Sequence, residues 1–142
     1  MQQKGSVATQ KEFIHLFSPL SKIKLGNRVM DVRSDMPEKE KADLILRELK
    51  KDKAISPGVQ LRDVATGLDG VLYLNLSKNL TEVHPGAPPE IVMVYSLVNS
   101  FAASFKDVRS VQLLVDGEPV YTIRGVVYTY LPLELNKDLT ED

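Results

Sequence analysis

The sequence lacks the residues and runs that several classes of protein require. Its 142 residues include neither cysteine nor tryptophan, so disulfides, thiolate metal sites and thiol catalysis are excluded. Its apolar runs are shorter than the roughly 18 residues of a membrane-spanning helix, so we expect no direct membrane insertion by this chain. An excess of charge is missing too, because 18 basic and 19 acidic residues leave a formal net charge of −1. This balance offers no field that would gather nucleic acid or an anionic membrane.

What remains is the composition of one ordinary globular domain. The chain is 43% hydrophobic and 26% charged, and a chain of this length buries about two-thirds of its surface on folding without a metal or a crosslink. Residues 1–11 lack periodicity and the apolar core of a signal peptide, and residues 136–142 are polar, so we expect both ends to be flexible. The predicted single domain covers residues 12–135.

The N-terminal half predicts two strands followed by a helix. Alternating apolar residues favour strands at Glu12–Phe17 and Arg28–Arg33, with a long connecting loop at Leu20–Asn27. Pro37–Lys51 is the clearest predicted helix, because one apolar stripe recurs at the helical spacing and Pro37 suits the first helical position. The stripe consists of Ala42, Ile45, Leu46 and Leu49.

The C-terminal half predicts two hairpins around a second helix. Strands are expected at Gln60–Ala65 and Val71–Leu76, around a turn that contains two glycines. The apolar segment Pro89–Phe105 is long enough for a helix and begins with a proline that suits a helix start. Asp116-Gly117 favours a two-residue type I′ turn, so a second hairpin is expected there. Its strands would be Arg109–Val115 and Glu118–Ile123, followed by a further β-like run at Gly125–Leu133.

Few side chains in this sequence can combine into a catalytic site. There is no glycine-rich phosphate loop, no Gly-x-Ser-x-Gly elbow and no His-Glu-x-x-His helix, and the histidines are His15 and His84. Glu82 and His84 are compatible with a base and its orienting carboxylate, or with half a metal site. Their proline-rich loop favours a simpler interpretation, a turn in which the imidazole binds a backbone group. We expect no enzyme activity, no metal and no cofactor.

The second predicted helix carries the residues that point to a binding role. A broad apolar arc predicts its core-facing side, whereas Met93 and Leu97 project among serines on the side expected to face water. Two interpretations stand for this pair: ordinary scattered surface residues, or a surface that binds protein. Asn99 lies at the border of the arc, where we expect its amide to hydrogen-bond an adjacent loop or strand.

Four segments occur in an order that resembles the GerMN domains of sporulation and spore-germination proteins. They are Gly70–Ser77, the His84-Pro85-Gly86 loop, Val94–Ser100 and Val111–Gly117. The resemblance covers about Phe13 to Ile123. Ser100 stands where threonine is common in the family, and Ser56-Pro57-Gly58 replaces the usual Gly-Pro. Residues from Gly125 onward lie beyond the motif.

The resemblance implies an α+β fold, with two helices packed on a small mixed or antiparallel sheet, similar to the ring-building domains of sporulation and secretion channels. It also implies a non-enzymatic, extracytoplasmic interaction module, tethered to the membrane by a lipid or a helix that is missing from this chain. No catalytic residue is carried over from the family. The motif positions, for which the resemblance implies structural roles, are His84, Gly86, Asn99, Asp116 and Gly117.

Three functions are compatible with these observations. The first is a protein-interaction or assembly module of the cell envelope, which binds a partner or itself through Met93 and Leu97. The second is a domain that binds a small ligand or a cell-wall fragment in a polar pocket around Asn75, His84 and Asn99. The third is a hydrolase built on the histidine–carboxylate pair with a further carboxylate, and the sequence supports it least.

Overall fold

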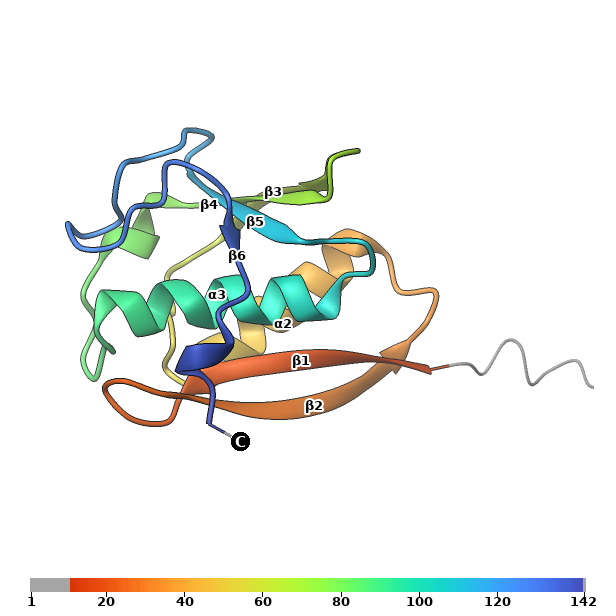
Figure 1. The fold of residues 1–142 in the computed structure, drawn as a ribbon, viewed down its shortest axis with the longest axis horizontal. Helices are drawn as coiled ribbons and strands as arrows, with labels where there is room; N and C mark the ends of the chain where they lie inside the picture. The colour runs from red at the N-terminus through yellow and green to blue at the C-terminus, as the bar shows by residue number, and fades with distance from the viewer. Residues whose placement is uncertain (1–10, 142) are drawn as a thin grey trace, which may run out of the picture.

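The fold is a stack of three layers, with the helices between two sheets (Figure 1). The computed structural model describes residues 11–141, so the flexible segment expected at residues 1–11 lies outside the described residues, apart from Lys11 at the start of the first strand. The elements in chain order are β1 (Lys11–Pro19), β2 (Leu25–Arg33), α2 (Glu38–Lys51), β3 (Leu61–Thr66), β4 (Val71–Leu76), the 3₁₀ helix η1 (Lys78–Thr81), α3 (Glu90–Ser104), β5 (Ser110–Val115), β6 (Leu133–Glu134) and the 3₁₀ helix η2 (Lys137–Leu139). The predicted α+β class is confirmed.

β1 and β2 form an antiparallel hairpin that is longer than the sequence indicates. The two strands pair over their full length. The long loop predicted at residues 20–27 is wrong, because a tight turn closes the hairpin and the Leu20 N–H donates to Lys24 O at 2.9 Å. β1 continues through Ser18 and Pro19, beyond the predicted end at Phe17, since a proline at the last strand position removes no ladder bond that the pair needs.

The four-stranded sheet is mixed, and its topology explains the place of α3. β3 and β4 form the predicted antiparallel hairpin, whereas β4 and β5 run parallel, with Leu74 opposite Leu113. Parallel neighbours need a crossover connection, and α3 provides it. Leu72, Leu74 and Leu76 are fully buried in the core that they share with both helices, as their alternation predicts.

The hairpin predicted around Asp116 and Gly117 forms its turn but not its second strand. The two residues have φ angles of 48° and 87°, and a type I′ turn requires positive φ at both. Beyond the turn, a single bridge pairs Val115 with Glu118. The pairing stops there, and the chain leaves β5 at Pro119.

Residues 119–132 form an irregular loop, which corrects the two strands predicted at Glu118–Ile123 and Gly125–Leu133. β6 begins at the end of this loop and pairs with Ser110 and Val111 of β5. The place beside β5 is therefore taken by a segment that is distant in the sequence. Local turn chemistry cannot reveal such a pairing.

The C-terminal tail predicted to be flexible is bound to the fold over its described residues. Thr140 bridges Leu25, and the Glu141 N–H donates to Leu25 O at 2.9 Å. Figure 1 shows this tail passing from the four-stranded sheet across α3 to the β1–β2 hairpin. An edge strand such as β2 offers backbone partners that a polar tail can use.

α3 is buried on two sides, which overturns the exposed surface predicted on it. Met93 is 1% exposed and Leu97 is 0% exposed, and both belong to the main core with Ile14 and Leu16 of β1. The prediction of an exposed side is wrong because a helix between two sheets needs two buried faces. Ile91, in the first turn of the same helix, is 39% exposed.

Candidate functional site

His84 and Glu82 bind different partners, which separates the predicted catalytic pair. His84 Nε2 lies 3.2 Å from Lys53 O, just after the end of α2. Glu82 accepts hydrogen bonds from Ser56 Oγ and Asn79 Nδ2. The imidazole thus binds a backbone group, as its loop favours. In the part of the chain that the structure describes, no group of three or more histidine, aspartate or glutamate side chains could hold a metal ion.

Asn75 of β4 is hydrogen-bonded to the Asp116-Gly117 turn. Asn75 Oδ1 accepts a hydrogen bond from the Gly117 N–H at 2.7 Å. Asp116 Oδ1 lies 3.5 Å from Arg62 Nε of β3. The turn is thereby fastened to two strands of the sheet, so these motif positions contribute to the frame and not to an open site.

Asn99 is fully buried in α3 and pairs with the backbone of one residue. Its Nδ2 donates to Asn136 O at 3.0 Å, and its Oδ1 accepts from the Asn136 N–H at 2.9 Å. Gly86 has a φ of 78°, which side chains rarely adopt, so a glycine suits this turn before α3. The fold does not gather Asn75, His84 and Asn99 around a shared pocket, because the three side chains bind separate segments.

An exposed aromatic cluster lies on the loop before β6, and it was not predicted from the sequence. Tyr121, Tyr128 and Tyr130 are 70%, 52% and 40% exposed. The rings of Tyr121 and Tyr130 stack with centroids 4.9 Å apart and an interplanar angle of 18°. Tyr128 lies 6.4 Å from each of them at larger angles. We call these three residues the tyrosine patch.

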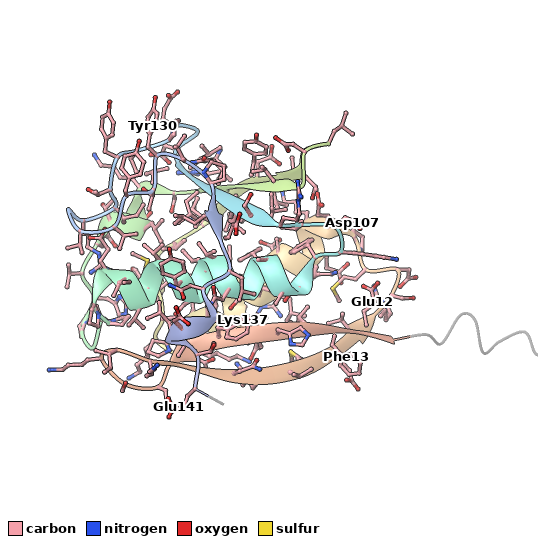
Figure 2. The ribbon with its side chains drawn as sticks, viewed as in Figure 1. Glu12, Phe13, Asp107, Tyr130, Lys137 and Glu141 are labelled. Carbon is pink, nitrogen blue, oxygen red and sulfur yellow. The ribbon has the colours of Figure 1, made fainter. Side chains whose placement is uncertain are left out.

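Figure 2 shows Tyr130 at the outer margin of the four-stranded sheet, on the opposite side of the molecule from Phe13 of β1. The loop that carries the patch is anchored at several points. Gln112 of β5 donates through Nε2 to Thr129 O at 3.1 Å. The buried carboxylate of Glu90, at the start of α3, accepts from the N–H groups of residues 126 and 127. The patch is therefore displayed in a fixed arrangement above β5 and α3.

Two surface hollows lie beside the His84-Pro85-Gly86 loop. The larger, of about 680 Å³, is formed by the β1–β2 turn and residues 86–89. Lys22 is the one ionisable residue among those that line it, so it offers no acid–base pair. The smaller, of about 200 Å³, is lined by His84, Lys50 and Lys53 together with apolar residues.

A partly buried ion-pair network joins β2 to α2. Arg28 Nη2 lies 2.9 Å from Glu48 Oε1, and Lys51 Nζ lies 3.0 Å from Glu48 Oε2. The hydrogen bond from Arg28, and then that from Lys51, lower the pKa of the Glu48 carboxyl below its ordinary value. Arg28 Nη2 also lies 3.1 Å from Asp52 Oδ2. Since each charge has a partner within the fold, the network holds two layers together.

The sequence contains evidence for the tyrosine patch, but Tyr128 and Tyr130 were assigned to the strand predicted at Gly125–Leu133. Three of the five tyrosines fall between residues 121 and 130, and residues 119–132 contain a single charged side chain, that of Arg124. The alternation of Tyr128 and Tyr130 was consistent with a strand that buries one face. The prolines at positions 119 and 132, which bound the stretch, are the local evidence against that strand.

Comparison with known proteins identifies the fold and the family. The Germane family model, described as sporulation and spore germination, matches residues 19–121. A candidate lipoprotein from Clostridium perfringens, solved as a crystal structure, has a TM-score of 0.54 at 16% identity over 87% of each chain. The tandem GerMN domains of the sporulation protein GerM from Bacillus subtilis have a TM-score of 0.56 at 15% identity, over 99% of this chain and 50% of that chain. Comparison with curated proteins gives no match.

These likenesses agree with the order of motifs along the chain. The two solved structures share the fold at low identity, and this chain spans about half the length of the tandem protein. The family model covers well over half of the residues, including β3, β4, α3 and β5. The chain therefore belongs to the Germane family of sporulation and spore germination, as a GerMN-like domain.

Proposed function

We propose that the chain is a non-enzymatic protein-interaction module of the cell envelope. Membership of the Germane family supports a role in sporulation or germination. The tyrosine patch carries the interaction role, because exposed aromatic side chains are enriched where proteins bind each other. Its rings are already held by one another and by an anchored loop, so binding costs little further side-chain entropy.

The proposed surface lies on the loop before β6 and not on α3. Val126 and Leu131 of the same loop are 74% and 58% exposed, so the loop also offers aliphatic side chains to a partner. Met93 and Leu97 are in the core and serve the fold. Exposed apolar and aromatic side chains on an anchored loop favour a partner surface that is itself apolar.

A hydrolase is not supported by the arrangement of ionisable groups. His84 points to Lys53 O, and Glu82 is engaged by Ser56 and Asn79, so no base and carboxylate face a common substrate position there. A cell-wall fragment would need free polar groups around Asn99, whose amide already binds Asn136. Protein binding is the function that the described surface supports best.

We place the module on the extracytoplasmic side of the membrane. The Clostridium perfringens structure is that of a candidate lipoprotein, and this similarity supports an extracytoplasmic location for the chain. No helix within the described residues is long and apolar enough to cross a membrane. Alkaline phosphatase fused to the native protein is expected to be active, and an inactive, stable fusion would contradict this location.

Photocrosslinking in cells tests the interaction role. A photoreactive phenylalanine analogue replaces Tyr121, and the matched control carries it in place of Leu68, which is fully exposed at the β3–β4 turn. Illumination is expected to give discrete protein adducts from position 121 that are absent at position 68. The same adducts at both positions, or none at position 121, would contradict a protein-binding patch.

A further inference from the structure

We propose that the tyrosine patch binds the tyrosine patch of a second copy of this chain, forming a two-fold symmetric dimer. This inference rests on the proposed function and names the partner of its surface. The patch and the residues beside it expose Tyr121, Val126, Tyr128, Tyr130 and Leu131. Covering these apolar and aromatic side chains removes their surface from water, which favours association.

The near absence of charge suits the patch to binding itself. In a two-fold contact the same surface meets its own copy, so several charges of one sign would repel each other across the interface. Residues 119–132 carry one charged side chain, Arg124. Glu118 precedes this stretch, and Asp116 is paired with Arg62. A two-fold contact through this stretch therefore brings together one pair of like charges at most, that of the two Arg124 side chains.

The orientation of the three rings makes the patch complementary to its own copy. Tyr121 and Tyr130 are stacked and cover each other's inner faces, whereas Tyr128 is tilted by 34° and 43° to them. Aromatic rings attract one another in both offset-stacked and edge-to-face arrangements. The patch thus presents outward ring faces and ring edges together, and the rings of a second copy find both kinds of partner.

Other occupants fit the same surface less well. A nucleic acid would need several basic side chains beside the rings to meet its phosphates, and this stretch offers Arg124 alone. A glycan would need polar groups beside an open ring face, whereas the carboxylate of Glu90, at the start of α3, is buried and bound to the N–H groups of residues 126 and 127 of this loop. Apolar protein surface remains the best match.

Sedimentation of the purified chain across about 10 µM to 1 mM tests the proposal. A small contact of this kind lies at the weak end of protein interfaces, so we expect monomer at the lowest concentrations and dimer at the highest. The double substitution Tyr121→Ser with Tyr130→Ser removes the stacked pair and is expected to raise the dimer dissociation constant at least about tenfold. Leu68→Ser, at the opposite end of the β4–β5 pair, is the matched control and should leave it unchanged.

NMR dilution of the unsubstituted chain provides a readout that does not depend on a variant. Concentration-dependent shifts are expected to be largest at the rings of the tyrosine patch, with Tyr73 of β4 as the internal reference. A monomer at every concentration, or a dimer that the double substitution leaves intact, would overturn the proposal. A monomeric chain that still gives adducts with another protein from position 121 would remove the second copy as the partner and leave the proposed function standing.

Discussion

Asn99 shows how one buried side chain fixes the C-terminal segment. It has no exposed surface, and it exchanges hydrogen bonds with both backbone groups of Asn136. Removing a buried amide destabilises the fold more than removing an exposed one, because the backbone groups that it bonded lose this hydrogen-bond partner. The sequence predicted an amide that binds a neighbouring segment, and the structure identifies that segment.

Asn99→Ala is expected to lower the free energy of unfolding by about 1–3 kcal/mol, because it leaves the Asn136 N–H and C=O without these partners. Urea denaturation measures the change. Asn27→Ala is the matched control, since Asn27 is exposed in β2 and should have little effect. Equal losses in the two variants would show that the Asn99–Asn136 pair does not hold the tail.

Glu48 gives the stability of the chain a pH dependence. Its pKa is lowered by the hydrogen bonds from Arg28 and then Lys51, so the unfolded state binds its proton more readily than the folded state. This contribution is present above the ordinary value of 4.5 and is lost as the pH falls through the lowered pKa.

Glu48→Gln is therefore expected to be less stable than the natural chain at pH 7, by about 1 kcal/mol. The difference should shrink as the pH falls below the ordinary glutamate value, because the natural side chain then becomes neutral too. Thermal unfolding across the pH range measures it, with the exposed Glu40→Gln as control. A difference that stays constant down to the acid limit would rule out the ion pair as its source.

At the scale of elements, two serines of α3 hydrogen-bond the edge of β1 that does not face β2. Ser100 Oγ accepts from the Phe17 N–H, and Ser104 Oγ accepts from the His15 N–H, both at 2.8 Å. Four helical residues rise about 6 Å, close to the roughly 6.8 Å of two strand residues. The match lets each hydroxyl meet every second residue of β1. Continuing the register brings Ser96 toward a proline, which has no N–H.

Ser100→Ala is expected to destabilise the chain by about 1–3 kcal/mol, because the buried Phe17 N–H loses its acceptor. Ser96→Ala is the matched control within the same helix. Ser96 is equally buried, but its hydroxyl donates to Val92 O of its own helix, so its removal should be nearly neutral. Denaturant unfolding compares them, and a larger loss for Ser96→Ala would contradict the serine–strand contact.

The elements that the sequence predicted well are those set by local patterns. The apolar stripe of α2 and the alternating leucines of β4 are each satisfied by one buried face, so periodicity alone locates them. The elements that it missed depend on distant partners. The water-facing side assigned to α3 is covered by β1. β5 pairs with β4 and β6, and its pairing with the segment after its turn is limited to the Val115–Glu118 bridge. Periodicity says nothing about a second covering layer.

The candidate site was the least predictable part for the same reason. Tyr121, Tyr128 and Tyr130 meet only because the loop folds back on itself, with Thr122 bridging Tyr128. The family motif ends before most of this loop, so the resemblance gave no role to it. The motif positions themselves, such as Asn99 and Gly117, are engaged within the frame.

At the scale of the whole molecule, the three layers separate the frame from the proposed binding surface. The β1–β2 hairpin and the C-terminal tail close one side, and the tyrosine patch stands at the outer margin of the other sheet (Figures 1 and 2). Changes on the patch should therefore alter binding without unfolding the core. This separation is what an interaction module with an exchangeable surface loop requires.

Footprinting of tyrosines by hydroxyl radicals, in cells and on the dilute purified chain, tests the central claim most directly. Tyr73, 38% exposed in β4, is the internal reference. If the tyrosine patch is the binding surface, Tyr121, Tyr128 and Tyr130 will be modified several-fold more slowly in cells than in the purified chain, while Tyr73 reacts equally in both. Equal reactivity of the patch in the two samples would contradict the claim.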